Sequence, residues 1–220
     1  MIVAVIGEKG GTGKTTFSTN LAGLRAVAGR DVLVVDADRQ GSASYWAEAR
    51  GGKGLKPVAC VQKFGDGLAR AVRDMSRRYE DIVIDIGAGD SKEIEGALRV
   101  ADRAIIPVQP TGLDVWTLGL LDDRIAEAKV ANDGLRAWVV INRASPNPRD
   151  GDTQQAHNAI SNCENIKVAA VVVRDRVSFK RAVPAGMVVS EYKPSDSKAM
   201  EEMDKLYKIV FGEENAVHGS

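Results

Sequence analysis

The sequence contains few aromatic residues and very little cysteine or histidine. Of its 220 residues 5% are aromatic, two are cysteine and two are histidine. We therefore expect a core built mainly from Val, Ile, Leu and Ala. Cys60 and Cys163 do not have the spacing of metal ligands, which argues against a zinc site. Two reduced cysteines are typical of a cytosolic protein, so we predict a cytoplasmic location.

The chain also lacks a net charge and a long hydrophobic run. It has 30 Lys and Arg residues and 30 Asp and Glu residues, so any nucleic-acid site must be a local patch. No apolar run approaches the roughly 18 residues that span a bilayer. The first apolar run, Ile2–Ile6, has no basic segment before it and leads into glycines, unlike a signal peptide. We expect no membrane partner.

Short runs rich in Val and Ile alternate with segments of helical periodicity. Runs that are apolar at consecutive positions are typical of strands covered on both faces in a parallel sheet. The helical segments each have one apolar face, as at Leu118, Leu121 and Ile125. We predict a doubly wound, mostly parallel α/β fold with helices on both faces, in one domain over residues 1–211 with a polar tail at 212–220. The predicted strands are Ile2–Ile6, Val32–Asp36, Val58–Gln62, Ile82–Ile86, Ala104–Val108, Ala137–Asn142 and Val168–Val173.

A glycine-rich loop follows the first predicted strand and precedes a helix. Residues 7–15 fit the pattern G-x-x-x-x-G-K-[ST], in which backbone N–H groups converge on phosphate oxygens. The helix that follows directs the positive end of its dipole toward the same anion. We expect Lys14 to contact the β- and γ-phosphates of a nucleotide and the Thr15 hydroxyl to bind Mg²⁺.

Three aspartates follow predicted strands at the edge where ligands bind in such sheets. Asp36 and Asp38 lie on one side of an extended segment, so both can face the phosphates. One can hold a Mg²⁺-bound water, and the other can orient or deprotonate the attacking water. Asp85 ends a hydrophobic strand, which is the Walker B arrangement, and is expected to act on Mg²⁺ through water. Gly87 and Gly89 after it allow a mobile loop.

The segment Lys9–Thr16, with the sequence KGGTGKTT, looks like the deviant Walker motif of the ParA/MinD ATPases. This resemblance implies a P-loop NTPase fold with ATP and Mg²⁺ as cofactors. It implies that Lys9 crosses to the partner's nucleotide in an ATP-sandwich dimer, so that Lys9, Lys14 and Asp38 are the catalytic residues. Asp36 would support the metal with Thr15 and Asp85. The nucleotide-binding residues would be Gly10, Gly11, Thr12, Gly13, Lys14, Thr15, Thr16 and Asn142, the last of these at the adenine.

The chain departs from the family pattern at Arg39, where the family usually has proline. This departure bears on the stiffness of the loop rather than on the carboxylates. The last helical segment has Glu201, Glu202 and Asp204 on its polar face, which disfavours binding to anionic lipid as in MinD. No segment for an operator-binding helix-turn-helix precedes the first predicted strand. The sequence is therefore most similar to a short ParA of the ParF kind.

Two groups of basic residues are candidates for DNA contact. The family binds DNA through its C-terminal region, so by resemblance we expect non-specific DNA contacts there. The residues concerned are Arg174, Arg176, Lys180 and Arg181. Arg70, Arg73 and Arg77 also repeat along one face of a predicted helix, where they are either ordinary solvated charge or phosphate contacts.

The resemblance implies an ATPase that is slow until a partner stimulates it. We expect an ATP-dependent homodimer that binds DNA non-specifically, associates with the nucleoid, and segregates a plasmid or chromosome with a centromere-binding adaptor protein. One alternative is a cargo-positioning ATPase of the same family. Another is a metabolic P-loop ligase or kinase, against which Lys9 and the basic residues argue.

Overall fold

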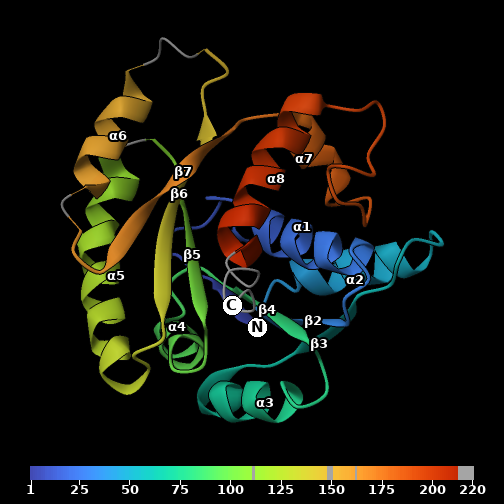
Figure 1. Cartoon of the computed structure of the whole chain (residues 1–220), viewed down its shortest axis with the longest axis horizontal. Coiled ribbons are helices and arrows are strands. Elements are labelled where there is room, and N and C mark those ends of the chain that lie inside the picture. Colours follow the sequence, from blue (N-terminus) through green and yellow to red (C-terminus); the bar gives the residue numbers. More distant parts are fainter. Residues whose placement is uncertain (111, 148–150, 162, 213–220) are drawn as a thin grey trace, which may run out of the picture.

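The predicted strands form one parallel sheet. The computed structural model describes residues 1–110, 112–147, 151–161 and 163–212. Within them the strand order is β3-β2-β4-β1-β5-β6-β7, and each neighbouring pair is parallel (Figure 1). This arrangement confirms the predicted fold class. The strands are β1 Ile2–Val5, β2 Val32–Ala37, β3 Ala59–Gln62, β4 Asp81–Ile86, β5 Arg103–Val108, β6 Arg136–Ala144 and β7 Ile166–Arg174.

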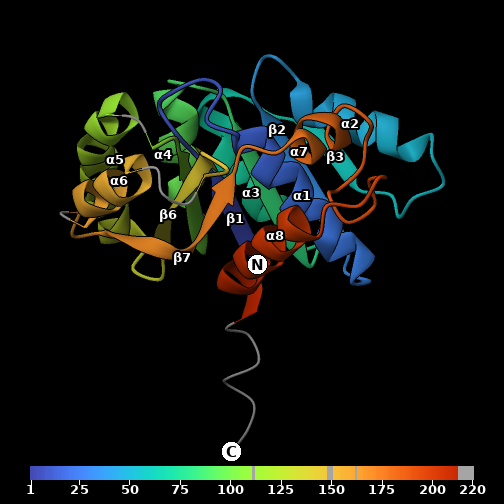
Figure 2. The same cartoon turned by 90° about the horizontal axis from the view of Figure 1, so that it is seen from above.

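Helices cover both faces of the sheet, as Figures 1 and 2 show. Buried side chains form two clusters, one on each face of the sheet. The predicted apolar face of α5 is buried at Leu118, Leu121 and Ile125. One face carries α1 Lys14–Val27, α2 Ser42–Gly51, α7 Val177–Ala182 and α8 Ser197–Phe211. The other carries α3 Leu68–Met75, preceded by the 3₁₀ turn Gly65–Gly67, with α4 Ser91–Leu98, α5 Gly112–Ala131 and α6 Asp152–Ile160.

The strand order brings the polar strand ends together. β1 lies between β4 and β5, and β4 separates it from β2. In the β2–β4 ladder Asp36 is the register partner of Asp85, and in the β1–β4 ladder Val5 pairs with the same aspartate. The loop after β1 therefore begins beside two buried carboxylates at the carboxyl edge of the sheet, where ligands bind in open α/β folds.

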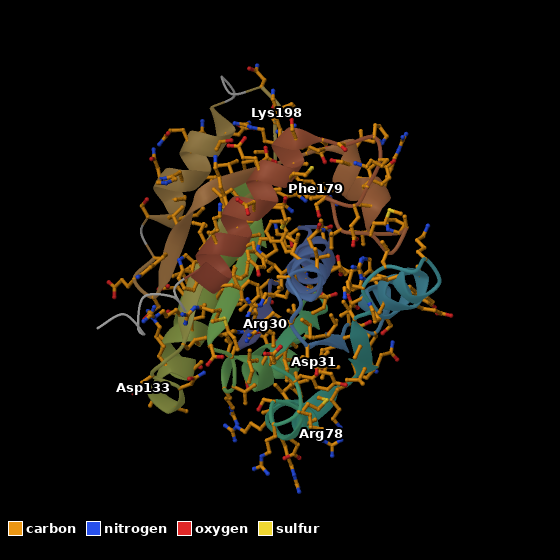
Figure 3. The ribbon with its side chains drawn as sticks, turned by 45° about the vertical axis from the view of Figure 1, so that its right-hand side comes forward. Arg30, Asp31, Arg78, Asp133, Phe179 and Lys198 are labelled. Atoms are coloured by element: carbon orange, nitrogen blue, oxygen red, sulfur yellow. The ribbon has the colours of Figure 1, made fainter. Side chains whose placement is uncertain are left out.

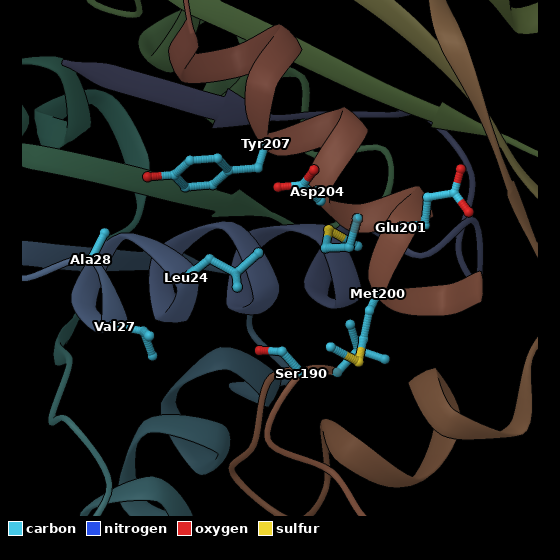
Figure 4. Close-up of a pocket in the computed structure, with 10 residues that line it drawn as sticks. Leu24, Val27, Ala28, Ser190, Met200, Glu201, Asp204 and Tyr207 are labelled. Carbon is cyan, nitrogen blue, oxygen red and sulfur yellow. The ribbon is translucent and has the colours of Figure 1, made fainter. Parts of the chain in front are cut away.

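An apolar groove lies between α1 and α8, away from the phosphate loop (Figure 4). Its volume is about 470 Å³, and it is lined by Leu24 and Val27 from the last turns of α1 and by Met200 and Tyr207 of α8. The phosphate loop adjoins the opposite end of α1. Among the described residues, no helix has both the length and the hydropathy to cross a membrane.

A buried arginine ties α2 to the loop before α8. Arg50 is 0% exposed, and its guanidinium pairs with both oxygens of Glu191 at 2.7 and 2.9 Å. It also donates to the carbonyls of Lys56 and Gly186. Burial opposes ionisation of Glu191, but the hydrogen bond from Arg50 holds the pKa of this carboxyl below its ordinary value. The pair fixes the loop between α7 and α8, whose course the alternation of strands and helices does not predict.

Replacing Arg50 with Ala is expected to lower the free energy of unfolding by about 3–5 kcal/mol, because Glu191 loses its partner in a buried setting. Chemical denaturation followed by circular dichroism measures the change. Lys205→Ala, which breaks an exposed pair with Glu201, is the control and should change stability little. Equal changes in the free energy of unfolding would show that the buried pair stabilises the fold no more than the exposed pair does.

Candidate nucleotide-binding site

The phosphate loop joins β1 to α1, as the motif predicts. Gly13 precedes the first residue of α1 with φ of 101°, a left-handed conformation that favours glycine. A Cβ atom at this position would lie 2.1 Å from the Asn142 side-chain nitrogen. The Asn142 amide donates to the Thr12 carbonyl at 2.6 Å. The end of β6 therefore braces the loop at the point where it turns into the helix.

Lys14 is held inside this loop. Its side chain is buried, and Nζ donates to the Lys9 carbonyl at 2.8 Å. Burial lowers the pKa of Lys14, and the carboxylates of Asp85 and Asp38 oppose this shift. The predicted phosphate-binding ammonium thus already lies among the predicted carboxylates. The Lys9 side chain is half-buried beside it.

Asp85 joins the end of β4 to the first turns of α1. One of its oxygens accepts a hydrogen bond from the Thr15 hydroxyl and the other from the Ser18 hydroxyl, each at 2.8 Å. The residue is fully buried, and burial raises the pKa of Asp85 to about 7 despite these hydrogen bonds. The nearby carboxylates of Asp36 and Asp38 add to the increase in pKa. Ser18, one turn after Thr15, was not among the predicted site residues.

Asp36 organises the loop after β2. One of its oxygens accepts from the Ser44 amide and hydroxyl at 2.8 and 2.6 Å, and the other from the Asp38 amide at 3.2 Å. Both carboxylate oxygens are therefore engaged in fixing Asp38 and the start of α2. The sequence prediction that Asp36 supports a metal stays a prediction, and the structure gives this residue a positioning role.

Asp38 faces the glycine loop after β4. A Cβ on Gly87 would lie 2.3 Å from an Asp90 oxygen and 3.3 Å from the Asp38 carboxyl carbon, so the two loops approach closely here. The pKa of Asp90 is raised by burial first, then by Glu93 and Asp38. Arg39, which stands in place of the family proline, lies over the Phe64 ring at 5.4 Å. This cation–π contact gives the loop an anchor that proline would otherwise provide.

The residues at this edge fit a magnesium ion. The Thr15 hydroxyl and the Asp85 carboxylate offer oxygen ligands, which Mg²⁺ prefers. The pKa of Asp85 is raised mainly by its burial, and the carboxylates of Asp36 and Asp38 add to the increase. No group of three or more His, Cys, Asp or Glu side chains in the described residues is arranged to hold a metal. Mg²⁺ keeps several waters and is bound partly by substrate phosphates, so one or two protein oxygens can hold it.

A second cavity lies beside the start of α1. It has a volume of about 280 Å³, and Thr16, Asn142, Arg143 and Phe179 are among the residues that line it. Pockets that bind small molecules have volumes from about 300 Å³ upward, so this cavity is close to the lower end of that range. Arg143 has φ of 53°, the only positive value at a non-glycine residue of the described chain. Such backbone strain is concentrated at functional sites, yet the residue type gives no signal of it.

The structure also brings in a glutamine that sequence reasoning missed. The side-chain amide of Gln109, just after β5, donates to the Gly11 carbonyl at 3.0 Å. Gly10 and Gly11 are exposed at the tip of the loop. Its position in the sequence could have indicated it, because Gln109 is a polar residue at the carboxyl end of a buried strand, like Asn142 at the end of β6.

Three of the four basic residues predicted to contact DNA are engaged within the chain. Arg176 pairs with Glu202 at 2.5 Å, and Lys180 pairs with Asp175 at 2.7 Å. The Arg174 guanidinium donates to the Ser145 carbonyl. Arg181 is exposed. Arg174, Arg176 and Lys180 also line the 280 Å³ cavity. The contact of the four residues with DNA stays a prediction.

Comparison with known proteins identifies the family. The family model described as the CobQ/CobB/MinD/ParA nucleotide binding domain matches residues 3–218. The chain therefore belongs to this family, with the deviant Walker motif of its ParA/MinD ATPases. The maintenance of carboxysome distribution protein A of Gloeobacter kilaueensis is 31% identical over 91% of this chain and 88% of its own length.

Two further comparisons agree with this assignment. The chromosome-partitioning ATPase Soj of Thermus thermophilus is 25% identical, over 90% of each chain. Among solved structures, the septum site-determining protein MinD of Pyrococcus horikoshii, complexed with Mg-ADP, superposes with a TM-score of 0.73 at 19% identity. The match covers 98% of this chain and 97% of that one, and it shows the shared fold.

The buried Asp85 predicts a pH dependence of stability. A carboxyl whose pKa is raised to about 7 in the folded chain contributes stability below its unfolded pKa near 4 and loses it as pH rises toward 7. In this window the free energy of unfolding should fall by about 1.4 kcal/mol per pH unit from this group. Asp85→Asn should remove that slope, as urea unfolding of the nucleotide-free protein between pH 4 and 8 would measure.

Asp66→Asn, at an exposed position, is the control for removing one carboxylate. It should leave the difference between pH 4 and pH 7 as in the wild type. Parallel pH profiles for the wild type and Asp85→Asn would contradict the assignment.

Proposed function

We propose that the chain is an ATP-hydrolysing switch that dimerises on ATP, binds DNA without sequence preference and moves a cargo through an adaptor protein. The observation that carries the proposal is the phosphate loop with a second lysine, Lys9, five residues before the buried Lys14. A phosphate loop that only binds nucleotide within one chain needs Lys14 but not Lys9. Membership of a family of P-loop ATPases supports the proposed hydrolysis of ATP.

In the proposed reaction the chain positions groups rather than forming a bond to the substrate. The loop amides and Lys14 would bind the β- and γ-phosphates at the start of α1. Asp38 would orient the attacking water and accept its proton, which is supported by a loop that Asp36 fixes and that lies close to Gly87. Thr15 and Asp85 would hold Mg²⁺, which neutralises phosphate charge when bound.

We assign the adenine to the 280 Å³ cavity that Thr16 and Asn142 line. The position next to the first turn of α1 suits a base whose phosphates lie in the loop. An amide donates and accepts, so Asn142 suits an adenine edge. One N–H of its amide donates to the Thr12 carbonyl, which leaves the second N–H to donate and the oxygen to accept at the base.

Two kinds of cargo are candidates, and each is suggested by one of the relatives. Segregation of a plasmid or chromosome with a centromere-binding adaptor is supported by the Soj likeness. Positioning of a protein cargo is supported by the carboxysome-distribution relative, which has the higher identity of the two. Affinity capture from the native host with an ATP-locked chain separates them. A DNA-bound adaptor supports segregation, whereas a component of a protein assembly supports positioning.

Lys9→Ala should leave ATP binding by the monomer within about two- to threefold of the wild type and prevent the ATP-dependent dimer. The physical reason is that Lys14, not Lys9, is buried within the chain's own phosphate loop. Sedimentation velocity with a non-hydrolysable ATP analogue measures the dimer. Lys14→Ala, which should abolish ATP binding itself, is the matched variant. A wild-type dimer from Lys9→Ala would overturn the role across the subunits.

Asp38→Ala should lower the turnover number at least 100-fold while ATP binding persists, because a positioned base contributes about 10²–10⁴-fold. The ATP dimer of this variant should accumulate. Phosphate release measures turnover, and Asp66→Ala, at an exposed position on another loop, is the control. Undiminished turnover in Asp38→Ala would assign proton transfer to another group.

A further inference from the structure

The exposed side of α3 and the end of α4 form an arginine-rich surface. We call the residues Arg70, Arg73, Arg77, Arg78 and Arg99 the α3 arginine surface. All five are exposed, while Leu68 and Val72 on the opposite side of α3 are fully buried. Figure 3 shows Arg78 at the lower end of the molecule, beneath α3 and distant from Phe179. The Arg73 guanidinium donates to the Arg99 carbonyl at 3.5 Å, which joins the two helices within one surface.

These five arginines differ from the C-terminal basic cluster in their partners. Within the described part of the chain, no carboxylate is paired with any of them. Asp74 is the only acidic residue between positions 68 and 78. Arg176 and Lys180, in contrast, are neutralised by Glu202 and Asp175. The positive charge of the α3 arginine surface is therefore available to an external anion.

We propose that the α3 arginine surface contacts the phosphate backbone of duplex DNA, an inference that rests on the proposed function. Arg70 and Arg73 lie on α3, and Arg77 and Arg78 lie in the turn that follows its last residue, Met75. Arginines that follow one another along an exposed edge in this way can contact successive phosphates of a DNA backbone. The surface consists of flexible guanidinium groups on α3, in the turn after it and at the end of α4, without an aromatic side chain on α3 to stack on a base. Such a surface suits contacts with phosphates rather than with base edges.

The position of this surface also accounts for control by nucleotide. α3 covers the face of the sheet, whereas ATP would bind at the carboxyl edge. ATP therefore acts on the surface by joining two chains, which places two α3 arginine surfaces in one particle. Linking two weak sites raises the apparent affinity by about 10²–10⁴-fold without any new contact. A monomer retains the surface but binds DNA weakly.

The test measures the salt dependence of binding to random-sequence duplex DNA by the full chain with a non-hydrolysable ATP analogue. Arg70→Gln with Arg77→Gln is the test variant, because neither residue lines the hollow that Glu95 and Glu127 share with Arg73 and Arg99. Lys53→Gln with Lys56→Gln removes the same charge from an exposed loop and is the control. Lys180→Gln with Arg181→Gln tests the C-terminal cluster. Sedimentation establishes that each variant still forms the ATP dimer.

The proposal expects the test variant to bind DNA at least tenfold more weakly at moderate salt. Its slope of log K against log salt should decrease by about 0.9 for each lost phosphate contact, or about 2 per protomer. The control should match the wild type. Wild-type affinity and slope in the test variant, with loss in the Lys180 and Arg181 variant, would overturn the proposal but leave the proposed function intact. Failure of the wild type to bind DNA in any nucleotide state would instead remove the DNA component of the proposed function.

Discussion

The hydrogen bonds of Asp85 to Thr15 and Ser18 are the contacts on which the site depends. They connect the end of a central strand to the first turns of α1. This helix follows the phosphate loop, and Lys14 at its start lies near the carboxylates of Asp85 and Asp38. Burial of Lys14 and Asp85 opposes the charged form of each, which is a cost of the site in the folded chain. Mg²⁺ would add positive charge beside the carboxylates, and a nucleotide would bring the anion that Lys14 neutralises.

The sheet and the phosphate loop could be predicted because their signals are local. Val- and Ile-rich runs define each strand, and a glycine pattern between a strand and a helix has one physical use. The strand ends differ by one or two residues from the predicted bounds, as at Val58, which is buried but precedes β3. The aspartates at strand ends were predictable for the same reason, since the parallel order places Asp36 and Asp85 in register.

The environment of the basic residues could not be predicted, because it depends on partners that are distant in sequence. Arg176 is neutralised by Glu202, which lies on another helix, and no spacing rule connects the two. The same is true of Arg50 and Glu191, 141 residues apart. The strained backbone of Arg143 and the contact of Gln109 with the phosphate loop likewise arise from tertiary packing. The family resemblance favoured the C-terminal cluster, whereas the pairing of Arg176 and Lys180 with carboxylates leads us to propose the α3 arginine surface.

The proposed function requires that ATP controls the association of this chain with DNA, which one equilibrium measurement tests. Binding of the wild-type chain to labelled random-sequence duplex DNA is followed without nucleotide, with ADP and with a non-hydrolysable ATP analogue, at low and moderate salt. We expect salt-sensitive binding with the ATP analogue and little binding in the other two states. Equal binding in all three states, or none in any, would overturn the proposed control by ATP.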